Sequence, residues 1–187
     1  INKIRTINKK IVLMQCNTNY TANIENFKYI QLNVLKKYAQ LFPDVILGLS
    51  DHTLGHTTVL GAVTLGAKVI EKHFTDNNNF KGPDHVFSMN PVTWREMIDR
   101  TRELELALGG VIKKVEENES ETVILQRRCL RASRDLTKDS IITKEMIEAL
   151  RPAPNDAIVP YDIDKIIGKK LTSNYVKGAY FKYGDIE

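Results

Sequence analysis

Two histidines stand out as candidate metal ligands, because each lies at the end of a short apolar segment. His52 follows the segment 45–50 (VILGLS), and His73 lies near the end of the segment 68–74 (KVIEKHF). If these segments are neighbouring parallel strands, about 4.8 Å apart, both imidazoles lie at the same edge of a sheet. Both rings can then bind the same divalent ion, each at about 2.0–2.1 Å, which leaves positions open for water and a substrate oxygen. The spacing therefore predicts a Lewis-acid metal site.

Each histidine also has a simpler interpretation. A single histidine at a strand end is more often a capping or surface residue than a ligand, whereas two at equivalent places in successive units favour the metal site. The alternation of side chains along a strand places Ser50 on the face of His52, and Glu71 on the face of His73. Glu71 is therefore a candidate catalytic residue that orients metal-bound water, or alternatively a buried partner of a Lys or Arg.

The segments around the histidines alternate between strand and helix patterns. Continuous apolar runs predict buried strands at 11–16, 45–50 and 68–74. Apolar residues at helical spacing predict three helices: 24–41 with Asn23 as the cap, 57–65 closed by Gly66, and one from Pro91 to Gly109 with Asn90 as the cap. Strand and helix in alternation, with short connections, are typical of parallel α/β structure.

Three strands do not close a barrel or form a well-covered sheet, and the first strand would have an open edge. Either the chain is a piece of a larger (β/α) barrel, or neighbouring strands come from residues outside this sequence. We favour the first interpretation.

The composition and the pattern of apolar segments change after residue 110. Residues 111–122 (VIKKVEENESET) are polar and acidic, which predicts a linker. The rest consists of short segments between turn residues, which predicts a small, mostly β module whose clearest helical turn spans 143–150, with Thr143 as the cap. We therefore expect a first domain over 1–110 and a second over 123–187.

The composition narrows the class of protein. The chain has a net charge of +4, but its basic pairs are scattered, which disfavours nucleic-acid binding. No apolar run approaches the roughly 18 residues of a membrane helix, and the polar opening does not look like a signal peptide. Cys16 and Cys129 are too few for a disulfide scaffold, so a reducing cytoplasm is the expected compartment.

Four short motifs carry a family resemblance. They are QCNTNY (15–20), GLSDHTLG (48–55), IEKHFT (70–75) and GPDH (82–85), and together they resemble the sialic acid synthase family of N-acetylneuraminate, legionaminate and pseudaminate synthases. The second half is similar to the antifreeze-like (SAF) domain that ends these enzymes, through DLTKDSIITKEMIEALRP (135–152) and IIGKKL (166–171). The two resemblances occur in the expected order.

The resemblance implies a fold and a reaction. The fold would be α/β: the C-terminal units of a (β/α)8 TIM barrel, followed by the small SAF domain. The reaction would be a metal-dependent condensation of phosphoenolpyruvate with an N-acylated amino sugar (hexosamine) aldehyde, giving a sialic-acid-like nonulosonic acid and phosphate. His52 and His73 would hold the metal, usually Mn²⁺, with Mg²⁺ or Co²⁺ as other possibilities.

The resemblance also implies roles for single residues. Ser50 and Thr18 match positions that contact phosphoenolpyruvate, and Tyr20 and Asp84 match positions that contact the sugar. Arg151 matches an arginine that the SAF domain of one subunit extends into the site of the other to hold the N-acyl group. This implies a domain-swapped homodimer.

Two other functions remain open at this point. Because the family's first five strands are absent from this sequence, we expect it to represent part of a longer protein. If it were the entire polypeptide, a catalytically inactive fragment acting as a carbohydrate-binding or structural module would be the alternative. A different metal-dependent barrel enzyme, such as a pyruvate aldolase, ranks lower because nothing in that class requires the second module.

Overall fold

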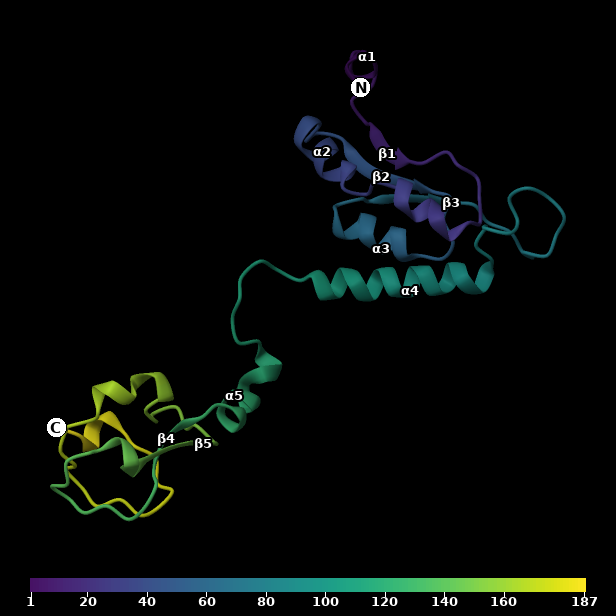
Figure 1. Cartoon of the computed structure of the whole chain (residues 1–187). Coiled ribbons are helices and arrows are strands. Elements are labelled where there is room, and N and C mark those ends of the chain that lie inside the picture. Colours follow the sequence, from purple (N-terminus) through teal and green to yellow (C-terminus); the bar gives the residue numbers. More distant parts are fainter. The chain divides into compact units, whose positions relative to one another are not determined.

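The computed structural model describes residues 1–187, which divide into two compact units, Ile1–Val111 and Ile112–Glu187. Figure 1 labels the elements along the chain. None of the helices combines the length and the apolar character that crossing a membrane requires.

A three-stranded parallel sheet lies at the centre of the first unit, in the order β1-β2-β3 (Figure 1). Its strands are β1 (Val12–Cys16), β2 (Ile46–Asp51) and β3 (Val69–Lys72). All three predicted strands are confirmed, and β3 is shorter than predicted. The chain after it makes an isolated parallel bridge from Phe74 to Met89.

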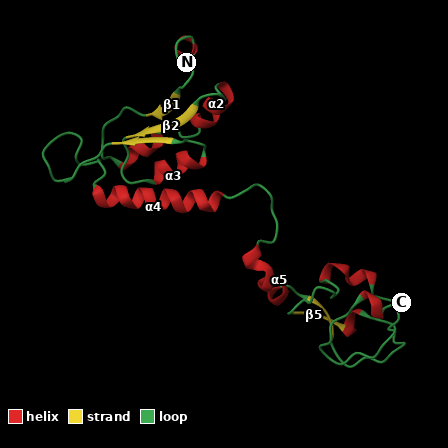
Figure 2. Ribbon diagram, turned by 180° about the vertical axis from the view of Figure 1, so that it is seen from behind, coloured by secondary structure: helices red, strands yellow, loops and turns green.

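Helices pack on one face of this sheet (Figure 2). They are α2 (Val34–Leu41), α3 (Thr57–Thr64) and α4 (Pro91–Leu108), and a short α1 (Asn2–Arg5) precedes β1. Leu35 of α2, Leu49 of β2 and Ala62 of α3 belong to one buried cluster. Val59 of α3 and Met97 of α4 form a second. The period-2 pattern of the strands therefore sends Leu47, Leu49 and Asp51 toward the helices.

The opposite face of the sheet is open within this unit. Val12, Ile46 and Val69 lie there, with exposed fractions of 44%, 49% and 36%. Because three strands form an open sheet, the chain has the α/β architecture but does not itself show a closed (β/α)8 barrel. The barrel stays a prediction.

Asparagine caps begin two of the helical segments, as predicted. The Asn90 side chain accepts a hydrogen bond from Thr93 N, and the Thr93 hydroxyl accepts one from Asn90 N, which is a capping box. Asn23 accepts from Glu25 N at the start of η1 (Ile24–Tyr29), a 3₁₀ helix.

The prediction of one continuous helix over 24–41 is wrong. The chain forms η1 and then α2, and Gln31 between them has a φ of +54°. In a continuous helix, Val34 N would donate to Ile30 O. Here the Gln15 side chain of β1 donates to Ile30 O at 2.9 Å, and Val34 N donates to Gln31 O instead. A side chain from β1 therefore satisfies the Ile30 carbonyl at the point where the helical hydrogen-bond pattern is interrupted.

The second unit surrounds its own apolar core, with Leu130, Ile142, Ile158, Ile166, Leu171 and Phe181 buried in one cluster. β4 (Cys129–Ala132) and β5 (Ile147–Leu150) form an antiparallel pair. The other elements are η2 (Glu117–Glu119), α5 (Ser120–Gln126), η3 (Lys144–Met146), η4 (Pro160–Lys165) and η5 (Tyr183–Asp185). Isolated antiparallel bridges, such as Leu136 to Tyr175, complete it.

One local prediction fails in this unit. The helical turn predicted over 143–150 is only η3, since residues 147–150 pair with β4. Ile147 packs against the core cluster while Glu148 is exposed, so burial follows a strand period there. The segment 111–122, predicted to be a linker, contains η2 and the start of α5.

Candidate metal and substrate site

The structure brings His52 and His73 together. β2 and β3 pair in parallel, with Asp51 opposite Lys72, so the histidines that follow these two residues lie side by side. Their ring centroids are 5.1 Å apart and the ring planes form an angle of 64°. Both rings lie at the carboxyl ends of the strands, where loops of α/β proteins build binding sites.

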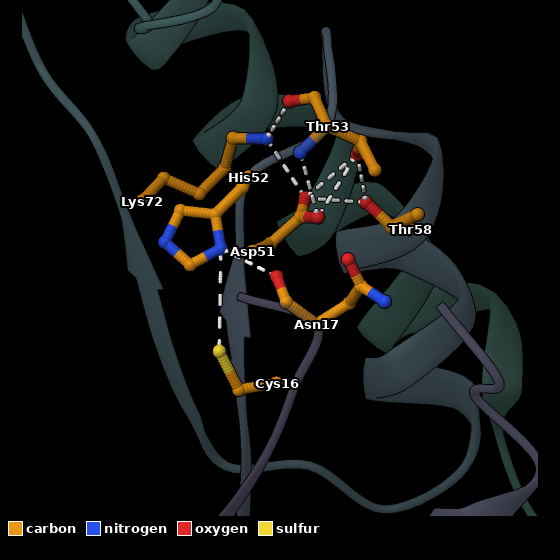
Figure 3. Close-up of polar contacts among 7 residues, drawn as sticks. All are labelled: Cys16, Asn17, Asp51, His52, Thr53, Thr58 and Lys72. Atoms are coloured by element: carbon orange, nitrogen blue, oxygen red, sulfur yellow. Dashed lines mark hydrogen bonds and ion pairs between the residues drawn. The ribbon is translucent and has the colours of Figure 1, made fainter. Parts of the chain in front are cut away.

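A backbone contact sets the tautomer of His52. Its Nδ1 lies 2.8 Å from the carbonyl oxygen of Asn17, in the loop after β1 (Figure 3). A carbonyl only accepts, so Nδ1 carries the proton and Nε2 keeps its lone pair. The Cys16 thiol is 4.0 Å from the same Nδ1. The second nitrogen of His52 is therefore available to a metal or another acid.

Asp84 lies beside the second histidine. Its Oδ2 is 3.6 Å from Nδ1 of His73, which is an ion-pair distance if the imidazole is protonated. Asp84 comes from the polar loop between β3 and α4. The structure thus brings one predicted sugar-binding residue to the histidine pair.

Aromatic rings surround the pair. The Tyr20 ring centroid is 4.3 Å from that of His52 and 5.4 Å from that of His73. Phe87, only 3% exposed, lies 5.1 Å from His73. Tyr20 is a predicted site residue, whereas the sequence reasoning missed Phe87. A signal was available only in its position, two residues after the GPDH motif.

The remaining predicted site residues are Ser50, Glu71, Thr18 and Arg151. Ser50 is half-buried on the open face, two residues before His52, and pairs in register with Glu71 of β3. Glu71 is exposed on the same open face. Thr18 is exposed in the loop between Asn17 and Tyr20. Arg151 belongs to the second unit, where it is exposed after β5.

A buried polar network lies on the other face of the same strand ends, and the sequence reasoning missed it. Lys72 Nζ is 2.8 Å from Asp51 Oδ2, and the hydroxyls of Thr53 and Thr58 also donate to Asp51 (Figure 3). The sequence does contain a sign of this network. Asp51 and Lys72 are charged, yet the alternation of side chains along their strands places both on the face that the helices cover.

The donors at the histidine pair suit a divalent cation. Imidazole nitrogen is a common metal ligand, and a ligating histidine usually donates its other N–H to a carbonyl or carboxylate. His52 makes such a contact to Asn17, and His73 faces Asp84. No cluster of three or more His, Cys, Asp or Glu residues is arranged to hold a metal. The chain would therefore offer two nitrogens, and oxygens of water or substrate would complete the shell.

Comparison with known proteins decides the family. Residues 1–113 match the model of the NeuB family, and residues 127–187 match the model of the SAF domain. The chain belongs to the NeuB family. The resemblance to sialic acid synthases is thereby confirmed, and the α/β part of this NeuB-family chain is followed by a C-terminal SAF domain.

Curated relatives and solved structures agree with this assignment. The chain is 37% identical over 177 residues to N,N'-diacetyllegionaminic acid synthase of Legionella pneumophila, covering 95% of this chain and 48% of the relative. It is 30% identical over 168 residues to human N-acetylneuraminate-9-phosphate synthase, covering 90% and 46%. The chain thus spans about half the length of these relatives.

Among solved structures, the spore coat polysaccharide biosynthesis protein SpsE of Bacillus subtilis aligns with a TM-score of 0.53 and 28% identity, covering 100% of this chain and 56% of that one. A putative spore coat polysaccharide biosynthesis protein E of Chromobacterium violaceum aligns with a TM-score of 0.60 at 21% identity, covering 94% and 52%. The second likeness supports the fold alone.

Proposed function

We propose that the protein containing this chain condenses phosphoenolpyruvate with the open-chain aldehyde of an N-acylated amino sugar, giving a nonulosonic acid and phosphate. The observation that carries the proposal is the pair of imidazoles, 5.1 Å apart at the ends of adjacent parallel strands, with Nε2 of His52 free. Membership of the NeuB family, with relatives named as legionaminic and pseudaminic acid synthases, supports the choice of reaction.

A divalent cation at the pair, Mn²⁺ in the first place and Mg²⁺ or Co²⁺ otherwise, would act as a Lewis acid beside the sugar aldehyde. In the condensation, C3 of phosphoenolpyruvate forms a C–C bond with the aldehyde carbon. Water adds at C2, and phosphate leaves as its C–O bond breaks. His52 would present Nε2 to the cation, because its Nδ1 donates a hydrogen bond to the Asn17 carbonyl.

The chain's other residues would bind and orient the substrates. The hydroxyls of Ser50 and Thr18 suit the phosphate or carboxylate oxygens of phosphoenolpyruvate. The Asp84 carboxylate accepts hydrogen bonds from sugar hydroxyls, and Tyr20 lies against the same histidines. Glu71, exposed on the open face, orients water.

We further propose that the open sheet face lines the interior of a (β/α)8 barrel. Exposed Val12, Ile46 and Val69 are apolar side chains of the kind that fill a barrel core. Such a barrel needs strands beyond the three of this chain. Arg151, exposed after β5 of the SAF domain, would hold the N-acyl group in the site of a second subunit within a domain-swapped homodimer.

The test replaces His52 or His73 by Ala and measures Mn²⁺ binding, together with condensation of phosphoenolpyruvate with a panel of N-acylated hexosamines. Either change is expected to abolish Mn²⁺-dependent condensation without altering the circular dichroism spectrum. His56→Ala is the matched control. His56 is the N-cap residue of α3, and it makes no ring contact or side-chain hydrogen bond with His52 or His73. Undiminished turnover in either variant would exclude the metal assignment. If the protein without substitutions binds Mn²⁺ but shows no turnover, the result would favour a non-catalytic module.

A further inference from the structure

A buried ion pair lies directly behind the histidine pair. Asp51 and Lys72 immediately precede His52 and His73, and their side chains are 0% and 1% exposed. Successive residues of a strand point to opposite faces, so this ion pair occupies the helix side of the two strands whose other side carries Ser50 and Glu71. It joins β2 to β3 at the last register pair before the histidines.

Lys72 contacts the residues on both sides of His52, through the side chain of Asp51 and the backbone of Thr53. Its Nζ contacts the Asp51 carboxylate at 2.8 Å and donates to the Thr53 carbonyl oxygen at 2.7 Å (Figure 3). The residue before His73 therefore binds both chain neighbours of His52. A displacement of β3 relative to β2 cannot occur at this point without breaking one of these contacts.

Asp51 connects the strands to a helix as well. It accepts from Thr53 N at 3.1 Å, from the Thr53 hydroxyl at 2.9 Å and from the hydroxyl of Thr58 in the first turn of α3. Four donor groups thus converge on one carboxylate. The network fixes β2, β3 and α3 to one another within a few residues of the imidazoles.

Stability alone does not account for a charged pair at this place. Removing two charges from water is costly, and well-packed apolar residues of similar volume are often as stabilising as a buried ion pair. The Lys72 ammonium makes directional contacts to the Asp51 carboxylate and to the Thr53 backbone carbonyl. Apolar contacts lack this directionality, whereas charge-assisted hydrogen bonds fix the relative position of the two strand ends. The geometry indicates a positioning role.

We propose that Asp51 and Lys72 are positioning residues that set the separation and orientation of His52 and His73, and thereby the affinity of the histidine pair for a divalent cation. This inference rests on the proposed function. Neither residue would contact the cation, because both point to the opposite face of the sheet.

The test measures the dissociation constant for Mn²⁺ in the full chain, by calorimetry or by electron paramagnetic resonance of the free ion. Lys72→Met keeps the volume and removes a positive charge near the cation, so electrostatics alone would tighten binding. Positioning predicts the opposite sign: binding weaker by about 10–100-fold, the range typical of residues that orient metal ligands. The sign therefore separates the two effects.

A double variant covers the case in which the single change prevents folding. Asp51→Asn with Lys72→Met leaves the net charge unchanged and no charge unpaired, and the same loss of affinity is expected. Leu35→Ala is the structural control, because Leu35 is fully buried in the core under α2 and has no part in the network. Its folded form should bind Mn²⁺ as the natural chain does.

The outcomes are distinguishable from a failure of the proposed function. Natural affinity in the Lys72→Met and double variants, alongside lost binding in His52→Ala, would overturn the positioning role and leave the metal site intact. Equal loss in Leu35→Ala would also overturn it. If His52→Ala binds Mn²⁺ like the natural chain, the proposed metal site and this inference fall together.

Discussion

Gly48 in the central strand is expected to be intolerant of even one added methyl group. An added Cβ would lie 2.7 Å from the carbonyl oxygen of Val69 on β3 and 2.9 Å from Cγ of Met14 on β1. The first obstacle is backbone and cannot rotate away. Gly48→Ala therefore forces β3 away from β2, close to the strand ends that carry the histidines.

The expected magnitude follows from two opposing effects. Overpacking of a tight site costs about 1–3 kcal/mol. Replacing Gly by Ala within a regular element recovers about 0.5–1 kcal/mol of backbone entropy. Gly48→Ala should therefore lower the free energy of unfolding of the first unit by about 1 kcal/mol, and by no more than about 2.5 kcal/mol.

Gly61 in α3 provides a matched control. An added Cβ there would also meet an atom at 2.7 Å, but that atom is Cδ1 of Leu32, the mobile end of a side chain. A side-chain adjustment costs about 0.5–1.5 kcal/mol, and Ala gains about 0.8–1.0 kcal/mol over Gly in a helix. Gly61→Ala should thus stay within about 1 kcal/mol of the natural chain, at the same nominal contact distance.

Urea unfolding followed by tryptophan fluorescence measures both variants. Trp94 is the single tryptophan of the chain and packs against the buried cluster of the first unit, so its signal reports that unit. The reasoning is refuted if Gly48→Ala unfolds at the natural urea concentration, or if Gly61→Ala is the less stable of the two.

Two further predictions concern a helix cap and a buried tyrosine. Asn90→Ala removes the cap of α4 and should lower the free energy of unfolding by about 1 kcal/mol in the Trp fluorescence assay. Asn33→Ala should change this free energy little, because Asn33 makes no side-chain cap bond at α2. Equal losses in the two variants would contradict this prediction. Burial, together with the hydrogen bond to the Asp185 carboxylate, raises the pKa of Tyr175. Because an unfolded tyrosine loses its proton near about pH 10, the folded state holds this proton longer, and stability that is complete below that pH is lost as the pH rises further. Tyr175→Phe should lower stability by about 1–2 kcal/mol at neutral pH and remove this part of the alkaline loss, measured by circular dichroism in urea; an unchanged alkaline slope would contradict the assignment.

Local patterns in the sequence were sufficient to predict the strands of the first unit, one of its helix caps and the position of the histidine pair. Strands at β1, β2 and β3, the Asn90 cap and the shared edge of His52 and His73 follow from period and spacing alone. These features depend on residues close together in the chain, so the sequence displays them directly.

Other features depended on partners far apart in the sequence. The Gln15 amide donates to the Ile30 carbonyl at the point where a helix of continuous apolar spacing is interrupted. Residues 147–150 have a helical pattern but pair with β4. In both places a tertiary contact satisfies a backbone group that local propensity would have satisfied differently.

The sequence by itself determined which residues are chemically able to form the site, and it determined the family through its motifs. Only the tertiary structure decided how those residues are held. Asn17 fixes the tautomer of His52, the Phe87 ring packs beside His73, and Lys72 of β3 forms an ion pair with Asp51 of the adjacent strand β2. The physical reason is that periodicity sets the face on which a side chain lies. Its hydrogen-bond partner depends on which distant segment the fold brings within about 3 Å.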